Sequence, residues 1–495
     1  MRDSRTTDWR SWAQQWLSLS VWAGLAVGVG VYLGRWMMSP NWESALRLAI
    51  MGGMTFAIMI NQADGFAVWL MVAPFGQTLY SEIWRILNIR LPAGVPDLTP
   101  DRLAAVLLGL IFVANLAIGK RKLQRLGTEV YMALFCVMIV PAIWTGLNGL
   151  TSTAQSVLDK FMIPFLVFVL AKNLFDPRGE HGLRRLATTL AVVETYLCYA
   201  ILYEHIRGVP ILSGGHTTVY SKSLPKIVSI LGNPAFLGTV LAMISTVMLY
   251  MAMHDSSKSG RAFYAVMFAL AVSGNFFCYN RGAWLALAVG FVVLLLEQRY
   301  RQLLLPAMMV AAAVALIYWE AVSASAVITE RLSNPTSIRF RLNLLETSRE
   351  MILDHLAFGV GVGNFSYYYL DYGGTWEDLA YDLPMPHNTY ILVLATMGLA
   401  GFVPYLLIFL STAWSLLRSY WRRRSGDAGR ALAVTGLAAV VMYMVSAAAV
   451  DLYVNVYTSF VLFFISGSII GYFSHLGDGV TAPRAESSVR PAAGP

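Results

Sequence analysis

A single histidine stands where an extended segment meets a long apolar run. His387 follows Pro384 and Pro386, and the apolar run 391–417 comes directly after it. Because proline disfavours the helical region for the residue before it, a helix is predicted to begin only at or just after the histidine. The positive end of that helix, together with partial desolvation, favours a neutral imidazole that can accept a proton as a general base. A histidine that only caps a helix, or lies in the lipid headgroup layer, fits these residues equally well.

Basic residues on the same predicted outer side of the membrane extend this chemistry. Arg281 stands in a turn between two apolar runs, and Arg341 lies on a predicted surface helix. Lys222 and Lys226 lie in an earlier outer segment. The arginine guanidinium pairs with phosphate oxygens through two parallel hydrogen bonds and stays charged, so two arginines at a lipid boundary predict a pyrophosphate site. A histidine base would deprotonate a hydroxyl nucleophile while the arginines stabilise the leaving pyrophosphate, which is group transfer without a metal.

The elements that must position these residues are membrane helices. With 57% hydrophobic and 13% charged residues over 495 positions, and a mean hydropathy of +0.59, the chain is too apolar for a water-soluble protein of this length. We therefore predict an all-α polytopic membrane protein of about 12–14 transmembrane helices with one large outer loop that contains amphipathic helices. The net charge of +8 is interpreted by its location along the chain and implies no nucleic-acid partner.

Apolar runs of spanning length divide the chain. The predicted spans are 17–34, 46–60, 65–79, 103–119, 130–147, 161–174, 187–206, 235–253, 262–279, 283–297, 303–319, 388–417, 431–450 and 453–473. The short pair 46–60 and 65–79 could be re-entrant, which would leave about twelve spans. Strongly basic short loops, such as 418–430, all fall on the inner side if the N-terminus is cytoplasmic.

These spans give a simple domain organisation. Residues 1–16 form a cytoplasmic N-terminus, and 17–319 hold about eleven transmembrane helices. Residues 320–386 form the large outer loop, which is followed by three C-terminal transmembrane helices in 387–476. The tail 477–495, rich in Pro, Ala, Gly and Ser, is predicted to be cytoplasmic and disordered.

The outer loop is predicted to contain an amphipathic helix over 337–358 that covers the site. Ile338, Leu342, Leu345, Ile352 and Leu356 recur at near-helical intervals. Two arginines, at positions 339 and 341, are only two residues apart on this helix and point to nearly opposite sides. At most one of the two can therefore face a site below the helix.

The rest of the loop leaves two questions open. The glycine-rich segment 359–364 is no P-loop, because no Gly-Lys-Ser/Thr follows it. It indicates either a close backbone approach or a backbone nest that binds an anion. The tyrosines that follow, with Trp376, could stack on sugar rings or form a plain interfacial aromatic belt.

Other chemistries and another class of protein compete with group transfer. No His-x-x-x-His, Cys-x-x-Cys or Asp-x-Asp motif faces the outer side, and no Gly-x-Ser-x-Gly elbow supplies a serine nucleophile. A secondary transporter would explain the many spans, with Asp64, Glu194, Glu204 and Asp451 as its intramembrane acids. These acids are scattered, however, and no matching pair of broken spans indicates inverted repeats.

Three blocks in the C-terminal half, from Gly232 onward, resemble the O-antigen ligase and polymerase superfamily of bacterial envelope glycosyltransferases. Residues 280–286 (NRGAWLA) resemble its Ser-Arg-Gly/Ala block, with Asn280 in place of serine. Residues 341–363 resemble its block of an arginine, an amphipathic helix and Pro-Leu-x-Gly-x-Gly, with Leu345 in place of an aromatic residue and Leu356 in place of proline. Residues 386–388 (PHN), before an apolar helix, are similar to its His-Asn block.

The resemblance implies an enzyme with no cofactor and with lipid-linked substrates. The donor would be a glycan on undecaprenyl pyrophosphate at the periplasmic face of the bacterial inner membrane, and Arg281 and Arg341 would grip its pyrophosphate. His387 would activate or orient the acceptor hydroxyl, which would attack the anomeric carbon with inversion and without a metal. The large loop would be periplasmic and both termini cytoplasmic.

The resemblance leaves the acceptor open. A ligase would use lipid A–core oligosaccharide, a polymerase would use another lipid-linked repeat, and a protein O-oligosaccharyltransferase would use a protein hydroxyl. The basic outer face favours the ligase, in lipopolysaccharide biosynthesis. Further candidate site residues are Lys222, Lys226, Arg339, Asn388 and Tyr390.

Overall fold

The described part of the chain is built from helices. The structure is a computed structural model that describes residues 42–75, 99–174, 181–208, 227, 229–317, 335–376, 384–424 and 427–477, and every regular element within them is helical. Eight of these helices are long and apolar enough to span a membrane. The fold class is therefore that of an all-α polytopic membrane protein, as predicted. The N-terminal 16 residues, the expected span 17–34 and the tail beyond residue 477 lie outside the described residues.

The helix bounds follow the apolar runs of the sequence closely. The helices are α2 (Trp42–Ile60), α3 (Gln62–Val72), η1 (Ala73–Phe75), α5 (Pro100–Ala117), α6 (Thr128–Met138), α7 (Val140–Trp144), α8 (Leu150–Val157), the π-helical turn η2 (Leu158–Met162), α9 (Ile163–Leu174), α10 (His181–Arg207), α11 (Pro234–His254), α12 (Lys258–Phe277), α13 (Arg281–Leu294), α14 (Gln298–Ile317), α17 (Pro335–Asp354), α18 (Phe365–Tyr368), α20 (Thr389–Trp421), α21 (Ala428–Ala447), η3 (Leu452–Val454) and α22 (Val456–Gly477). Helix α17 overlaps the predicted amphipathic helix but ends at Asp354, not at 358. Its buried side carries Phe340, Leu344 and Met351, whereas Leu342 and Leu345 of the predicted apolar face are exposed, because the helix packs on the bundle through the other side.

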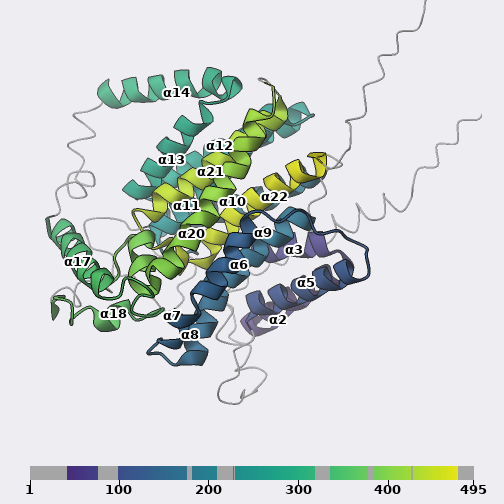
Figure 1. Cartoon of the computed structure of the whole chain (residues 1–495). Coiled ribbons are helices and arrows are strands. Elements are labelled where there is room, and N and C mark those ends of the chain that lie inside the picture. The colour runs from purple at the N-terminus through teal and green to yellow at the C-terminus, as the bar shows by residue number, and fades with distance from the viewer. Residues whose placement is uncertain are drawn as a thin grey trace, which may run out of the picture.

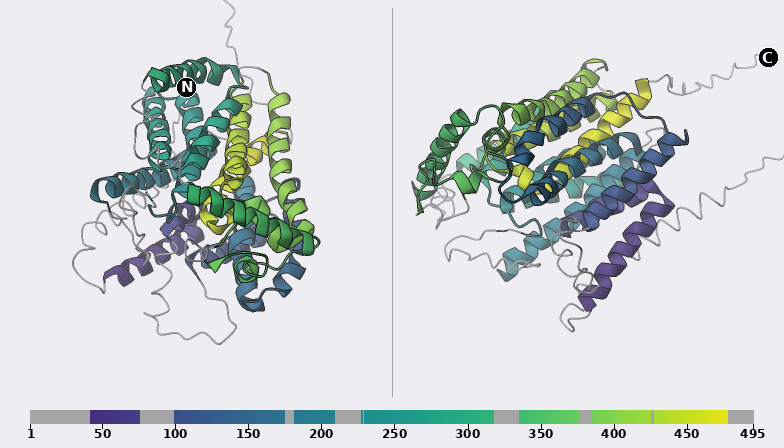
Figure 2. Two further views of the ribbon diagram at one scale, coloured as in Figure 1. Left: turned by 90° about the vertical axis from the view of Figure 1, so that its left-hand side faces the viewer. Right: turned by 60° about the horizontal axis from the view of Figure 1, so that its bottom comes forward.

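The long helices run side by side in a tilted bundle (Figure 1). Helices α17, α18, α7 and α8 gather at its lower-left end, which we call the site end, and α14 lies across the other end. Figure 2 shows α17 crossing in front of the long helices at the site end. A segment far from the C-terminal helices in sequence, α7 and α8, thus lies close to the elements that hold the predicted site.

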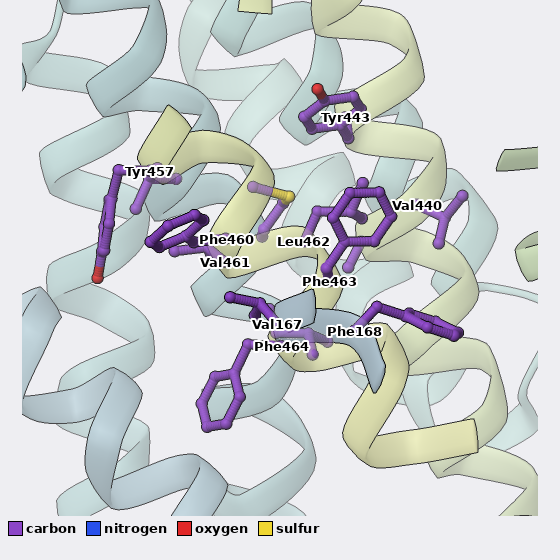
Figure 3. Packing of buried hydrophobic residues seen from close by; sticks show 14 of the residues in the cluster. Val167, Phe168, Val440, Tyr443, Tyr457, Phe460, Val461, Leu462, Phe463 and Phe464 are labelled. Atoms are coloured by element: carbon purple, nitrogen blue, oxygen red, sulfur yellow. The ribbon is translucent and has the colours of Figure 1, made fainter. Parts of the chain in front are cut away.

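Helix α22 packs against α9, α11 and α21 in the core. Figure 3 shows Phe463 of α22 and Phe168 of α9 in this core. The ring of Phe463 contacts those of Phe165, Phe168 and Phe409, with centroids 5.8–6.3 Å apart. Gly467 and Gly471 of α22 let its backbone approach α9 closely. A Cβ at Gly471 would overlap the backbone of Lys172 in α9. Small residues allow this close approach between membrane helices, where van der Waals packing drives association.

Helix α20 is broken within its apolar run, which the sequence predicts as one continuous span. Gly398 has φ 60° and ψ −167°, a conformation open essentially only to glycine. The chain that follows α17 fills the break: the N–H groups of Leu399 and Ala400 donate to the carbonyls of Leu356 and Ala357 at 2.8 and 3.0 Å. The freed backbone groups are therefore satisfied inside the protein, as a membrane interior requires.

Candidate functional site

The N-terminus of α20 presents His387 at the site end. Asn388 is the N-cap of the helix, and its Oδ1 accepts hydrogen bonds from the N–H groups of Tyr390 and Ile391 at 3.0 and 3.2 Å. The helix thus begins immediately after the histidine, as the preceding prolines predict. His387 itself has φ 52°, a left-handed conformation that is uncommon for a residue with a side chain. Such local strain is typical of functional positions and must be held by surrounding contacts.

Those contacts come from Asp451, in the linker between α21 and α22. Its Oδ2 accepts a hydrogen bond from the His387 backbone N–H at 3.0 Å and lies 3.9 Å from the imidazole Nδ1. The carboxyl side chain is only 5% exposed, while the imidazole is 27% exposed. Burial raises the pKa of Asp451 to about 7, although the His387 and Asn388 N–H groups and the charge of Arg341 act in the opposite direction. The carboxyl therefore changes its charge near neutral pH.

The linker that carries Asp451 is fastened to the start of α20. The Thr389 hydroxyl donates to the Val450 carbonyl and accepts from the Leu452 N–H, both at 2.8 Å. The Asn388 amide donates to the Ala448 carbonyl at 3.0 Å, and the Tyr390 hydroxyl donates to a carbonyl of α21. Asn388 and Tyr390, which the sequence offers as further site residues, thus hold the acid-bearing linker in place against the histidine.

Helix α17 carries an aromatic ring, Phe340, and a positive charge, Arg341, close to His387. The buried ring of Phe340 meets the imidazole of His387 edge-on, with centroids 6.3 Å apart. Arg341 is exposed, and its charge acts on Asp451 and lowers the pKa of that carboxyl. Arg339 is also exposed. Arg341 follows Phe340 directly on α17, so the ring contact of Phe340 with His387 places Arg341 in the neighbourhood of the histidine.

Arg281 lies at the start of α13, which packs against the linker. It is the first residue of α13 and is exposed, and the N-cap residue Asn280 accepts from the Ala283 N–H at 2.9 Å. The next residue, Gly282, packs so closely on the linker that a Cβ there would lie 3.0 Å from Cβ of Ala449. Arg281 is thus placed beside the segment that ends at Asp451. Lys222 and Lys226 lie outside the described residues.

The glycine-rich segment makes a close backbone approach. The N–H groups of Val360 and Gly361 donate to the carbonyls of Ala395 and Thr396 at 2.9 and 3.0 Å, and the Val362 N–H donates to Ala142. Because these three donors are used within the protein, they do not form an anion nest. The segment instead anchors the short first part of α20, and therefore the histidine at its start, to α7.

Asp451 is the site residue whose role sequence reasoning missed. The sequence suggested it only as one of several intramembrane acids of a transporter. The available signal was a lone acid at the end of a predicted span, in AAAVDLYVN. Its contact with a histidine 64 residues earlier could not be read from that pattern. Among the described residues, no group of three or more His, Cys, Asp or Glu side chains is arranged to hold a metal ion.

Comparison with known proteins matches part of the chain to a family and to a relative. Residues 265–406 match the model of the family described as O-Antigen ligase, and this range includes Arg281, Arg341 and His387. Over 83 residues the chain is 35% identical to the teichuronic acid biosynthesis protein TuaE of Bacillus subtilis (strain 168). That alignment covers 17% of this chain and only 16% of the relative. Residues 265–406, which include both arginines and the histidine of the site, are thus similar to the family described as O-Antigen ligase, in line with the resemblance of the three sequence blocks.

Proposed function

We propose that this protein is an O-antigen ligase, which transfers a glycan from undecaprenyl pyrophosphate to a hydroxyl of lipid A–core oligosaccharide. The observation that carries the proposal is the corner formed by His387, Asp451 and Arg341 at the end of a membrane bundle, with Arg281 on its flank. It combines a base with cations suited to a pyrophosphate leaving group. Arg281, Arg341 and His387 lie in the range 265–406 that matches the ligase family. A site at the membrane boundary suits two lipid-linked substrates.

The reaction is a single displacement at the anomeric carbon. His387 takes the proton of the acceptor hydroxyl as its oxygen forms a bond to the anomeric carbon. The bond from that carbon to the pyrophosphate oxygen breaks with its electron pair, and the charge that develops on the pyrophosphate is stabilised by Arg281 and Arg341. Attack opposite the leaving group inverts the anomeric centre. In this scheme the proton then leaves His387 for solvent or for the released pyrophosphate.

Asp451 assists this step by holding and polarising the histidine. Its bond to the His387 N–H fixes the left-handed backbone that presents the imidazole. When ionised, the carboxylate 3.9 Å from Nδ1 stabilises the positive charge that the ring acquires as it takes the proton. The role resembles that of the acid in other acid–histidine pairs, in which the acid orients the ring and is not itself the base.

The proposal also specifies the membrane and its sides. We place the protein in the bacterial inner membrane with the site end in the periplasm and both termini in the cytoplasm. The support is the charge distribution, since the strongly basic short loops then lie on the cytoplasmic side. The donor, the lipid A–core acceptor and membrane lipids are its expected partners, and no cofactor enters the scheme.

A polymerase of lipid-linked repeats is the second candidate. The same displacement would occur, with the hydroxyl of another lipid-linked glycan as the nucleophile. The relative of Bacillus subtilis carries a name that refers to teichuronic acid biosynthesis and not to ligation, which keeps this alternative open. A protein O-oligosaccharyltransferase would use the same donor side with a protein hydroxyl.

One reconstitution separates these activities. The purified full-length protein is incubated with an undecaprenyl-pyrophosphate glycan, lipid A–core and a hydroxyl-bearing acceptor protein, and the products are identified by mass spectrometry. The ligase proposal expects the glycan on lipid A–core. A lengthened donor with untouched lipid A–core would show a polymerase, and glycan on the protein would show an oligosaccharyltransferase. The absence of any covalent product would contradict glycan transfer and favour transport.

A further inference from the structure

Large aromatic side chains are exposed at the site end, away from the arginines. Trp144 at the end of α7 is 76% exposed, Tyr367 of α18 is 57% exposed and Trp376 is 75% exposed. The amide of Asn148 lies beside Tyr367, whose hydroxyl donates to Asn148 Oδ1 at 2.7 Å. We call Trp144, Asn148, Tyr367 and Trp376 the aromatic surface. None of these side chains takes part in the displacement described above.

The aromatic surface is held by a buried amide. Asn364 is 0% exposed, and its Oδ1 accepts from the Leu147 N–H at 2.9 Å. Its Nδ2 donates to the carbonyls of Thr145 and Val360 at 2.9 and 2.8 Å. The turn between α7 and α8 is therefore fastened to the start of α18. Because all these partners are backbone groups, the relative position of Trp144 and Tyr367 is set by a fixed local framework.

Two further contacts connect the aromatic surface to the rest of the loop. The Gly374 N–H donates to the Tyr369 carbonyl at 3.0 Å, which turns the chain back onto α18 just before Trp376. The Ser366 hydroxyl donates to the Pro384 carbonyl at 3.2 Å, only three residues before His387. Three extended residues span about 10 Å at most. A glycan joined to a substrate at His387 would need only a short path to reach Tyr367.

The charges in the loop change sign between the two regions. Its first part, residues 320–349, contains Arg331, Arg339, Arg341 and Arg349 with Glu320, Glu330 and Glu346, whereas no lysine or arginine occurs from 350 to 417. The acidic residues of the second part are Glu350, Asp354, Asp371, Glu377, Asp378 and Asp382. The arginines suit a pyrophosphate, whereas the acidic residues repel a substrate that carries carboxylates or phosphates.

We propose that the aromatic surface binds sugar units of the glycan substrate that carry no negative charge, either neutral sugars or amino sugars. This inference rests on the proposed glycan transfer. The flat apolar face of a pyranose ring stacks on an exposed aromatic side chain, while the amide of Asn148 supplies groups that bond to sugar hydroxyls. An amino sugar gains in addition from the acidic residues of this part of the loop.

The test measures binding without transfer. Full-length protein in nanodiscs of phosphatidylcholine is applied to a defined array of neutral, amino-bearing, carboxylate-bearing and phosphate-bearing oligosaccharides. We expect binding to the neutral or amino-bearing oligosaccharides, and Trp376→Ala and Tyr367→Ala should each weaken it about two- to tenfold. The control is Trp414→Ala, which removes a 57% exposed tryptophan from the part of α20 after Gly398. This change should leave oligosaccharide binding unchanged.

Three results would overturn the inference. These are strongest binding to carboxylate- or phosphate-bearing oligosaccharides, no binding to any of them, and binding that neither variant weakens. If neither variant weakens binding but both insert less well into bilayers, the aromatic surface is an interfacial aromatic belt. Transfer is assayed separately on the wild type. Binding without transfer would refute the proposed function alone, and transfer with no effect of the two variants on binding would refute only the aromatic surface.

Discussion

Replacing Asp451 by asparagine tests how the site activates its histidine. Asparagine keeps an oxygen that can accept the His387 N–H, so the change removes charge and leaves the shape intact. Two unit charges 3.9 Å apart interact by about 4 kcal/mol at an effective dielectric constant of about 20. Because the imidazole is 27% exposed, water screens part of this interaction, and we expect a loss of about 2 kcal/mol. That corresponds to a decrease in kcat of about 30-fold.

The pH dependence of the same variant gives a second, independent reading. The pKa of Asp451 is raised to about 7, so the carboxylate forms as the pH rises through neutrality. Wild-type activity should therefore increase with pH over about one unit on either side of that value. Asp451→Asn should lose the part of this increase that comes from the carboxyl, because an amide does not titrate.

The assay follows the initial rate of product formation by mass spectrometry at a series of pH values. Asp255→Asn, which changes an acid in the linker between α11 and α12, is the matched control, and its rate and pH profile should be those of the wild type. A wild-type rate and pH profile in Asp451→Asn would refute the role given to the carboxyl. Loss of the folded protein, seen by gel filtration, would show that the amide does not preserve the linker.

The remaining predictions concern the other residues of the site. His387→Ala and Arg281→Ala should abolish transfer while the protein stays inserted and folded, and normal transfer by either variant on a lipopolysaccharide gel would contradict the assigned roles. Arg341→Ala should reduce transfer more than Arg339→Ala, since the charge of Arg341 acts on the acid of the site; the reverse order of rates would contradict this assignment. Gly398→Ala should lower the thermal stability of the purified protein. The residue has φ 60°, and a Cβ there would overlap the backbone of Ala357, which fills the break in α20. An unchanged melting temperature would refute the break.

The class of the fold follows from local features of the sequence. Apolar length predicts membrane helices because a bilayer demands about twenty apolar residues per span. The start of α20 follows from Pro384 and Pro386, whose rings constrain the residues before them. Asn388 then satisfies the first free N–H groups of the helix. These predictions hold because each depends on neighbours in the chain.

The site depends on contacts that no local pattern carries. Asp451 meets His387 across 64 residues, and its burial comes from helices packed around the linker. The break at Gly398 is likewise hidden in an apolar run, because the chain that stabilises it lies about forty residues earlier, at Leu356 and Ala357. The sequence predicted that only one of two arginines would face the site. The structure links Arg341 to the acid beneath the histidine, an acid whose place no helix periodicity reveals.

The most direct test of the central claim is the stoichiometry of the reaction. The purified protein is mixed with an undecaprenyl-pyrophosphate glycan and lipid A–core in the presence of a chelator, and the free undecaprenyl pyrophosphate and the glycosylated lipid A–core are both quantified. The account predicts one released undecaprenyl pyrophosphate for each glycan joined to lipid A–core, with no need for a divalent metal ion. Glycosylated lipid A–core without released pyrophosphate, or transfer that stops when metal ions are removed, would contradict it.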